Sequence, residues 1–320
     1  MIDASKLLSS TELGSLATAL DSGSALYLPG SAQRFAGLFD ESRLRAVLSR
    51  MGDNTSGSGP SFGVMIADPL GDGLMHAESI SDLAGNGPDD PIDVALGCGH
   101  TICATDIAGF DDALESSLGK IRRALACPGD LRFNAYLSPT GAKTRMHTDV
   151  RISTSLQLSG RKRWRYQRQA AVALPRSAAQ IDRWGEVHWM NPLANAGPPI
   201  PRPIPAEIEE VTLGPGDLLS VPAGAWHEVI TEEHGLALNL SIRPTPMTRI
   251  LSALIDGSLG ASESWQRGLP ILSADHRDGP LPAEVRARLL ARLAELRTWI
   301  DELDPEADEL LGLWRALIDA

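Results

Sequence analysis

Short runs of alternating apolar and polar residues fill the segment 131–243, and this pattern constrains the fold more than any other feature of the chain. A period of two places successive side chains on opposite faces of a β-strand. Gly, Pro and Asp residues between the runs indicate turns. Strands are expected at 131–137, 152–158, 162–166, 208–213, 217–222 and 236–242. Many short strands separated by turns favour a β-barrel or a β-sandwich.

The flanking sequence changes to helical spacing. Helices are expected at 5–20, 40–52 and 106–125, and two amphipathic helices are expected after residue 281. The sequence therefore predicts a mainly β protein with flanking helices. Its expected parts are an N-terminal α/β segment (1–130) that completes and covers the barrel, a β core (131–245) and a C-terminal helical region (246–320). Six prolines in 191–206 exclude an interior strand there, so a long covering loop is expected.

Charge and hydropathy exclude two classes of partner. The 320-residue chain has a formal net charge of -12, whereas a general nucleic-acid binder needs a basic face. The N-terminus lacks a basic segment followed by an apolar run, and no apolar stretch approaches the roughly 18 residues that span a bilayer. We expect a cytoplasmic protein that binds neither nucleic acid nor membrane.

The stretch "RMHTDVRISTSLQLSGRKRW" (145–164) contains a histidine and a carboxylate two residues apart, His147 and Asp149. Such a triplet is weak on its own, because about one is expected by chance in this chain. Two others occur, His76-Ala-Glu78 and His276-Arg-Asp278, and both are interpreted as solvated loop residues. If His147 and Asp149 face inward, alternation brings a polar row to the same face, and a polar interior row indicates a wet or ionic cavity. That row is Arg151, Ser153, Ser155 and Gln157.

The run "RKRWRY" that follows Gly160 alternates again. It groups Lys162 with Trp164 and Tyr166 on one face and three arginines on the other. An ammonium group inside a barrel is costly unless an anion pairs with it. The anion could be the carboxylate of a ligand or a carboxylate of the core, and the two faces could also be reversed.

A second histidine follows the tight turn in "GPGDLLSVPAGAWHEV" (214–229), which places His227 near the barrel mouth. Two imidazoles and one carboxylate leave three positions of a six-coordinate metal open, the arrangement used by non-haem Fe(II) oxygenases. Further along, Asn239 and Ser241 form another polar row.

Three blocks, "HTDVRISTSLQLSGRKRWRY", "LGPGDLLSVPAGAWH" and "LNLSIRP", resemble the JmjC-type cupin Fe(II)/2-oxoglutarate oxygenases, and within them the bacterial ribosomal-protein hydroxylase branch. The resemblance implies a double-stranded β-helix (cupin or jelly-roll) core. It implies His147, Asp149 and His227 as iron ligands and Lys162, fifteen residues after the first histidine, as the 2-oxoglutarate anchor. Secondary co-substrate positions are matched more loosely by Thr144, Asn134, Tyr136, Asn239 and Ser241.

The implied activity is a dioxygenase that uses Fe(II), 2-oxoglutarate and O2 to hydroxylate an amino-acid residue in a peptide or protein, or a small biosynthetic substrate. Candidates for substrate access are Arg151, Ser153, Trp184 and Trp189. Two alternatives are a metal cupin that does not use 2-oxoglutarate and a non-catalytic cupin for binding or oligomerisation. The C-terminal helices could pack on the barrel or form a homodimer.

Overall fold

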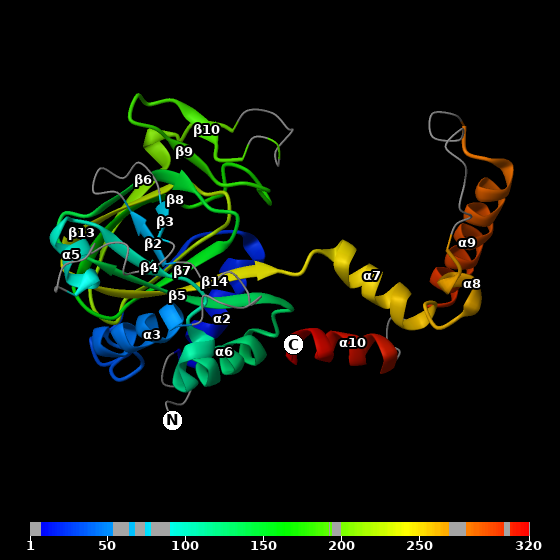
Figure 1. Ribbon diagram of the computed structural model, residues 1–320, viewed down its shortest axis with the longest axis horizontal. Coiled ribbons are helices and arrows are strands. Elements are labelled where there is room, and N and C mark those ends of the chain that lie inside the picture. The colour runs from blue at the N-terminus through cyan, green and yellow to red at the C-terminus, as the bar shows by residue number, and fades with distance from the viewer. Residues whose placement is uncertain are drawn as a thin grey trace. The chain divides into compact units, whose positions relative to one another are not determined.

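The computed structural model divides the chain into two compact units, Met1–Arg243 and Pro244–Ala320 (Figure 1). The residues that the structure describes are 8–53, 64–67, 74–77, 90–191, 193, 200–268, 280–303 and 308–319. The finer boundary expected at residue 130 stays a prediction.

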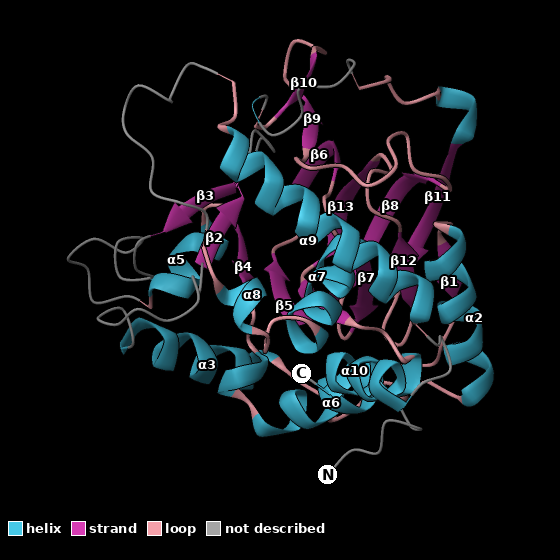
Figure 2. Ribbon diagram, turned by 90° about the vertical axis from the view of Figure 1, so that its right-hand side faces the viewer, coloured by secondary structure: helices cyan, strands magenta, loops and turns pink. Residues whose placement is uncertain are grey.

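Two antiparallel sheets build the first unit. The eight-stranded sheet has the order β1 (Leu26–Leu28), β12 (Leu218–Val221), β7 (Ile152–Gln157), β14 (Gly235–Pro244), β5 (Gly129–Ser138), β4 (Thr101–Ala104), β2 (Val64–Ala67), β3 (Leu74–Ala77). The six-stranded sheet, whose order can be followed in Figure 2, is β10 (Val187–Trp189), β9 (Ala179–Ile181), β6 (Lys143–Thr148), β13 (His227–Glu233), β8 (Arg161–Gln167), β11 (Ile208–Leu213). Together they form the predicted double-stranded β-helix.

Helices cover the outer face of the eight-stranded sheet. They are α2 (Ser10–Ser22), α3 (Glu41–Asp53), α5 (Pro91–Gly97) and α6 (Asp112–Leu125), with a 3-10 turn at Ala108–Phe110. Leu16 of α2 and Leu114 of α6 share one apolar cluster with Phe133 of β5 and Leu238 of β14. Because this cluster is on the outer face, the residues that alternate with it on the strands point into the barrel.

The described strands fall on all six predicted runs of the β segment, and α2, α3, α9 and α10 overlap predicted helices. Three features differ. The helix expected from residue 106 begins at Asp112, because the Asp111 side chain accepts hydrogen bonds from the first-turn N–H groups and caps it there. Helix α5, which begins at Pro91, was not among the predicted helices. His76 lies in β3 rather than in a loop, and residues 276–278 are outside the described part.

The second unit is helical. It contains α7 (Met247–Ser258), α8 (Glu263–Gln266), α9 (Ala283–Glu302) and α10 (Asp308–Asp319). The Trp265 indole of α8 donates a 3.0 Å hydrogen bond to Glu295 of α9. None of the described helices has the length and apolar character needed to cross a membrane.

Candidate metal centre

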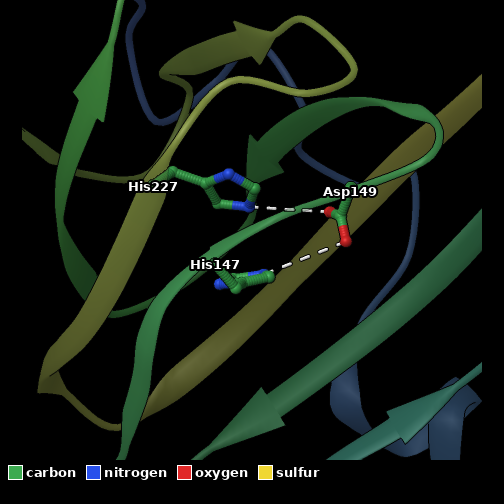
Figure 3. Close-up of side chains that lie close together, drawn as sticks. All are labelled: His147, Asp149 and His227. Carbon is green, nitrogen blue, oxygen red and sulfur yellow. Dashed lines mark ion pairs between the residues drawn. The ribbon is translucent and has the colours of Figure 1, made fainter. Parts of the chain in front are cut away.

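His147, Asp149 and His227 converge at one end of the six-stranded sheet (Figure 3). His147 lies near the end of β6, Asp149 follows in the loop to β7, and His227 opens β13 directly opposite His147. The Asp149 carboxylate lies 3.9 Å from His147 Nε2 and 3.5 Å from His227 Nε2. One ligand atom from each of the three residues lies within 4.8 Å of the others. They are therefore close enough to share one ion.

Backbone carbonyls orient both imidazoles. His147 Nδ1 lies 2.8 Å from the carbonyl oxygen of Arg145, and His227 Nδ1 lies 3.1 Å from that of Ala225. Because a carbonyl oxygen only accepts, each Nδ1 carries the proton and donates it. In the neutral ring Nε2 then carries no proton, and this is the tautomer that a metal ligand needs.

The electrostatics of the cluster favour the same protonation states. Burial, together with the neighbouring His227, lowers the pKa of His147 to about 4. For Asp149, burial raises the pKa, but contacts with His227 and His147 lower it more, to about 2. At neutral pH the site therefore presents a neutral imidazole at His147 and an ionised carboxylate at Asp149, the forms that bind a divalent metal.

The turn at 222–224 connects two of these ligands. Gly224 N donates a 2.9 Å hydrogen bond to the Asp149 carbonyl, three residues before His227. Gly224 has a φ of 78°, and a Cβ there would overlap the carbonyl oxygen of Val172. Only glycine fits this position, so the predicted tight turn also fixes the loop that carries Asp149.

A β-bulge turns Thr144 towards the same interior. His227 pairs with His147, and Val229 pairs with Thr144. An advance of two residues along β13 therefore corresponds to three residues along β6. Cross-strand partners share a face, and His227 and Val229 share one because they are two residues apart. Thr144 and His147 therefore face the same side despite their odd spacing.

Lys162 of β8 lies inside the barrel with 5% of its surface exposed. Its Nζ donates a 3.0 Å hydrogen bond to Ser138 Oγ and lies 5.8 Å from the centre of the Tyr136 ring. Burial lowers the pKa of Lys162 to about 8. Among the described residues, no carboxylate forms an ion pair with this ammonium group. Arg163 and Arg165, which the alternation places on the opposite face of the strand, pair instead with Glu232 and Glu228.

Of the other predicted positions, some face the barrel interior and others are already engaged by protein partners. Asn239 is buried and its Nδ2 donates to Ser153 Oγ at 2.5 Å, while its Oδ1 has no partner. Tyr136 and Asn134 alternate with the apolar residues of β5 and face inward. By contrast, Arg151 donates to Ser241 Oγ at 2.6 Å and pairs with Asp130 at 2.9 Å, so its charge is already balanced.

The two tryptophans are separated. Trp184 is 78% exposed at the tip of the β9–β10 hairpin, whereas Trp189 packs in an apolar cluster with Trp226 and Ile200. Sequence reasoning missed Ser138 and Gln180. Ser138 continues the period-two spacing of Asn134 and Tyr136 and was recognisable. Gln180, which pairs with His147, lies in a three-residue strand too short to show any period.

Comparison with known proteins supports the resemblance noted above. Residues 115–250 match the family model of the JmjC domain. The bifunctional lysine-specific demethylase and histidyl-hydroxylase NO66 of Drosophila willistoni is 26% identical over 176 residues, 51% of this chain and 21% of NO66. NO66 of Drosophila melanogaster is 31% identical over 150 residues, 43% of this chain and 20% of NO66.

A solved structure of YcfD, a ribosomal oxygenase from Escherichia coli in complex with cobalt and 2-oxoglutarate, has a TM-score of 0.50 at 14% identity. The match covers 92% of this chain and 67% of YcfD. At this identity the likeness shows a shared fold. The chain spans about a fifth of the length of the NO66 proteins it matches.

Proposed function

We propose that the first unit is an Fe(II)- and 2-oxoglutarate-dependent oxygenase that hydroxylates an amino-acid residue in a peptide or protein. One observation carries the proposal: a two-histidine, one-carboxylate cluster shares a barrel interior with the buried ammonium group of Lys162, which pairs with no carboxylate of the described residues. The names of the relatives agree with it, since NO66 is called a histidyl-hydroxylase and YcfD a ribosomal oxygenase.

The donor set fits Fe(II). His147, Asp149 and His227 would hold the ion through two neutral nitrogens and one carboxylate, which suits a metal that keeps open positions for small ligands. Fe(II) held here would bind 2-oxoglutarate and activate O2, and O2 would supply the oxidising equivalents that hydroxylate an unactivated C–H bond. The protein's own part is to orient the imidazoles through the carbonyls of Arg145 and Ala225.

The interior also fits a dicarboxylic co-substrate. Lys162 would pair with its distal carboxylate, and Ser138 holds the ammonium group in place at 3.0 Å. The buried Asn239 Oδ1 and Trp164 Nε1 both lack protein partners, so the interior retains polar atoms that a bound molecule or water would satisfy. Thr144, Tyr136 and Asn134 complete the proposed co-substrate contacts.

A peptide or protein substrate is favoured because the three candidate metal ligands are open to solvent on one side. The Asp149 side chain is 40% exposed, although His227 beside it is buried. A substrate segment could therefore reach the metal position from the surface without entering a sealed pocket.

The test is an anaerobic titration of Fe(II)-loaded protein with 2-oxoglutarate, with the weak visible charge-transfer band of a chelated 2-oxo acid as the readout. We expect the band in the wild type, its loss in His147→Ala, and at least a tenfold weaker 2-oxoglutarate affinity in Lys162→Ala with partial recovery in Lys162→Arg. His234→Ala is the matched control, because His234 is exposed and pairs with Glu41 outside the site.

Two results would contradict the proposal. Metal binding without the band would indicate a metal cupin that does not use 2-oxoglutarate. Absence of metal binding would indicate a cupin that serves as a binding or oligomerisation module.

A further inference from the structure

Cys103 is a buried thiol that the proposed function does not use. It lies on β4 directly opposite Tyr136 of β5. Its neighbours Ile102 and Ala104 belong to the apolar cluster on the outer face of the sheet, so the fully buried Cys103 side chain points into the barrel. Because burial raises the pKa of this thiol to about 12, it is uncharged at neutral pH. Cys103 therefore contributes a neutral hydrogen-bonding group to the interior.

A chain of hydrogen bonds ends at this thiol. The backbone N–H of Asp106 donates to Asn134 Oδ1 at 3.0 Å, which leaves Asn134 Nδ2 to donate to the Tyr136 hydroxyl oxygen. The hydroxyl proton of Tyr136 is then donated to Cys103 Sγ. Asp106 has a φ of 55°, a left-handed conformation that a non-glycine residue keeps only where its surroundings hold it. The orientation of the Tyr136 hydroxyl is thus fixed from both sides.

Tyr136 also lies beside the proposed co-substrate anchor. The Nζ atom of Lys162 is 5.8 Å from the centre of the Tyr136 ring, and Cys103 is close enough to interact electrostatically with the ammonium group. A sulfur atom is a weak hydrogen-bond acceptor, whereas an ionised carboxylate is a strong one. A carboxylate paired with Lys162 can therefore take over the hydroxyl proton from Cys103 at little cost in free energy.

We propose that Cys103 is a positioning residue for the co-substrate: it holds the Tyr136 hydroxyl in the ligand-free protein and releases it to the distal carboxylate of the 2-oxo acid. The proposal rests on the proposed oxygenase function and names a determinant of its co-substrate specificity. A stronger acceptor at position 103 would retain the hydroxyl group, and an apolar side chain would leave it without an acceptor. These two substitutions should change the affinity for a distal carboxylate in opposite directions.

The test compares two 2-oxo acids that share the metal-chelating end. 2-Oxoglutarate has a distal carboxylate, and 2-oxopentanoate has a methyl group in its place. Both are titrated anaerobically into Fe(II)-loaded, full-length protein, and the charge-transfer band reports each affinity without turnover. We expect Cys103→Ser to bind 2-oxoglutarate about fivefold more weakly than the wild type and Cys103→Ala to bind it about threefold more tightly. The affinity for 2-oxopentanoate should stay the same in both variants.

Two controls separate this role from a general effect on the fold. Cys127→Ala changes a free cysteine that packs against the apolar cluster on the outer face of the sheet, and it should bind both acids as the wild type does. In Tyr136→Phe the hydroxyl group is absent, so adding either substitution at Cys103 should no longer alter the affinity for 2-oxoglutarate. Loss of the effect in this background would show that Cys103 acts through the Tyr136 hydroxyl.

A metal-free measurement distinguishes failure of this proposal from failure of the proposed function. The infrared S–H stretching band of Cys103, identified by its loss in Cys103→Ala, should shift when Tyr136→Phe removes the hydroxyl group. A shifted S–H band without a charge-transfer band for either acid would reject the oxygenase function and, with it, the co-substrate role of Cys103. An unshifted S–H band, changes of the same sign in the Ser and Ala variants, or equal changes for the two acids would overturn the proposal for Cys103 alone.

Discussion

Lys162 shows how a residue proposed to bind a ligand can lower the stability of the fold that contains it. Its ammonium group is buried against Ser138 and the Tyr136 ring with no carboxylate partner among the described residues. Replacing such a group with an apolar side chain of similar length removes the desolvation cost. We expect Lys162→Met to raise the free energy of unfolding of the ligand-free protein by about 1 to 3 kcal/mol at pH 7, measured by urea denaturation, while 2-oxoglutarate binding is lost.

The same residue makes a pH-dependent prediction. The pKa of Lys162 is about 8 in the folded protein and near 10.5 in the unfolded chain, so the unfolded state binds more protons between these values. The stability of the wild type should rise, relative to Lys162→Met, as pH increases from 8 to 10.5. Denaturation of both proteins at several pH values across this window checks it. If the difference in stability between the two proteins stays constant across this window, a bound anion keeps the pKa of Lys162 near its ordinary value.

At the level of single residues, the sequence indicated most of the candidate site because alternation is a local property. Lys162, Trp164 and Tyr166 could be assigned to one face from "RKRWRY" alone, and the structure places them there. Arg151 shows the limit of this reasoning. It belongs to the polar row by spacing, yet Asp130 from a distant strand pairs with its guanidinium group. A partner 21 residues away is set by tertiary packing, which no local pattern contains.

At the level of elements, strands with a clear period were predicted and irregular ones were not. β6, "KTRMHT", contains a bulge between Thr144 and His147 and therefore lacks a regular alternation. β9 and β10 have three residues each. These are the strands that carry His147 and the hairpin beside it. The weakest sequence signal thus coincides with the candidate site, where cavity geometry takes precedence over regular pairing.

The turn at Gly224 allows a test of whether this turn positions the candidate metal ligand Asp149. In Gly224→Ala the added Cβ would meet the Val172 carbonyl oxygen in a backbone conformation with φ of 78°. We expect a loss of about 2 to 4 kcal/mol of folding stability and at least a tenfold weaker metal affinity, because Asp149 moves with the turn. Gly141→Ala is the matched control: φ is 88° and nothing lies within 4 Å, so only about 1 to 2 kcal/mol and no metal affinity should be lost. Equal metal affinities in the two variants would show that the turn does not position Asp149.

At the level of the whole molecule, the two units differ in how they bury apolar surface. The barrel unit encloses large side chains such as Trp226 and Phe133 completely. Helix α9 of the second unit instead exposes Leu289, Leu293 and Ile300, and Leu293 is 59% exposed. Their spacing of four and seven residues places them along one face of the helix. The opposite side of α9 contains Glu295, which bonds to Trp265 of α8.

This stripe leads to a prediction about assembly. A helix of 20 residues with one apolar stripe suits pairing with an identical helix, so we expect the protein to form a homodimer through α9. Light scattering after size exclusion should give the dimer mass for the wild type and the monomer mass for Leu289→Glu combined with Leu293→Glu. Thr298→Glu, on the far side of the helix, should remain dimeric. The monomeric variant should keep the charge-transfer band that 2-oxoglutarate produces, because all three candidate metal ligands lie in the barrel unit. A wild type that is monomeric at micromolar and higher concentrations would mean that the stripe is covered within one chain.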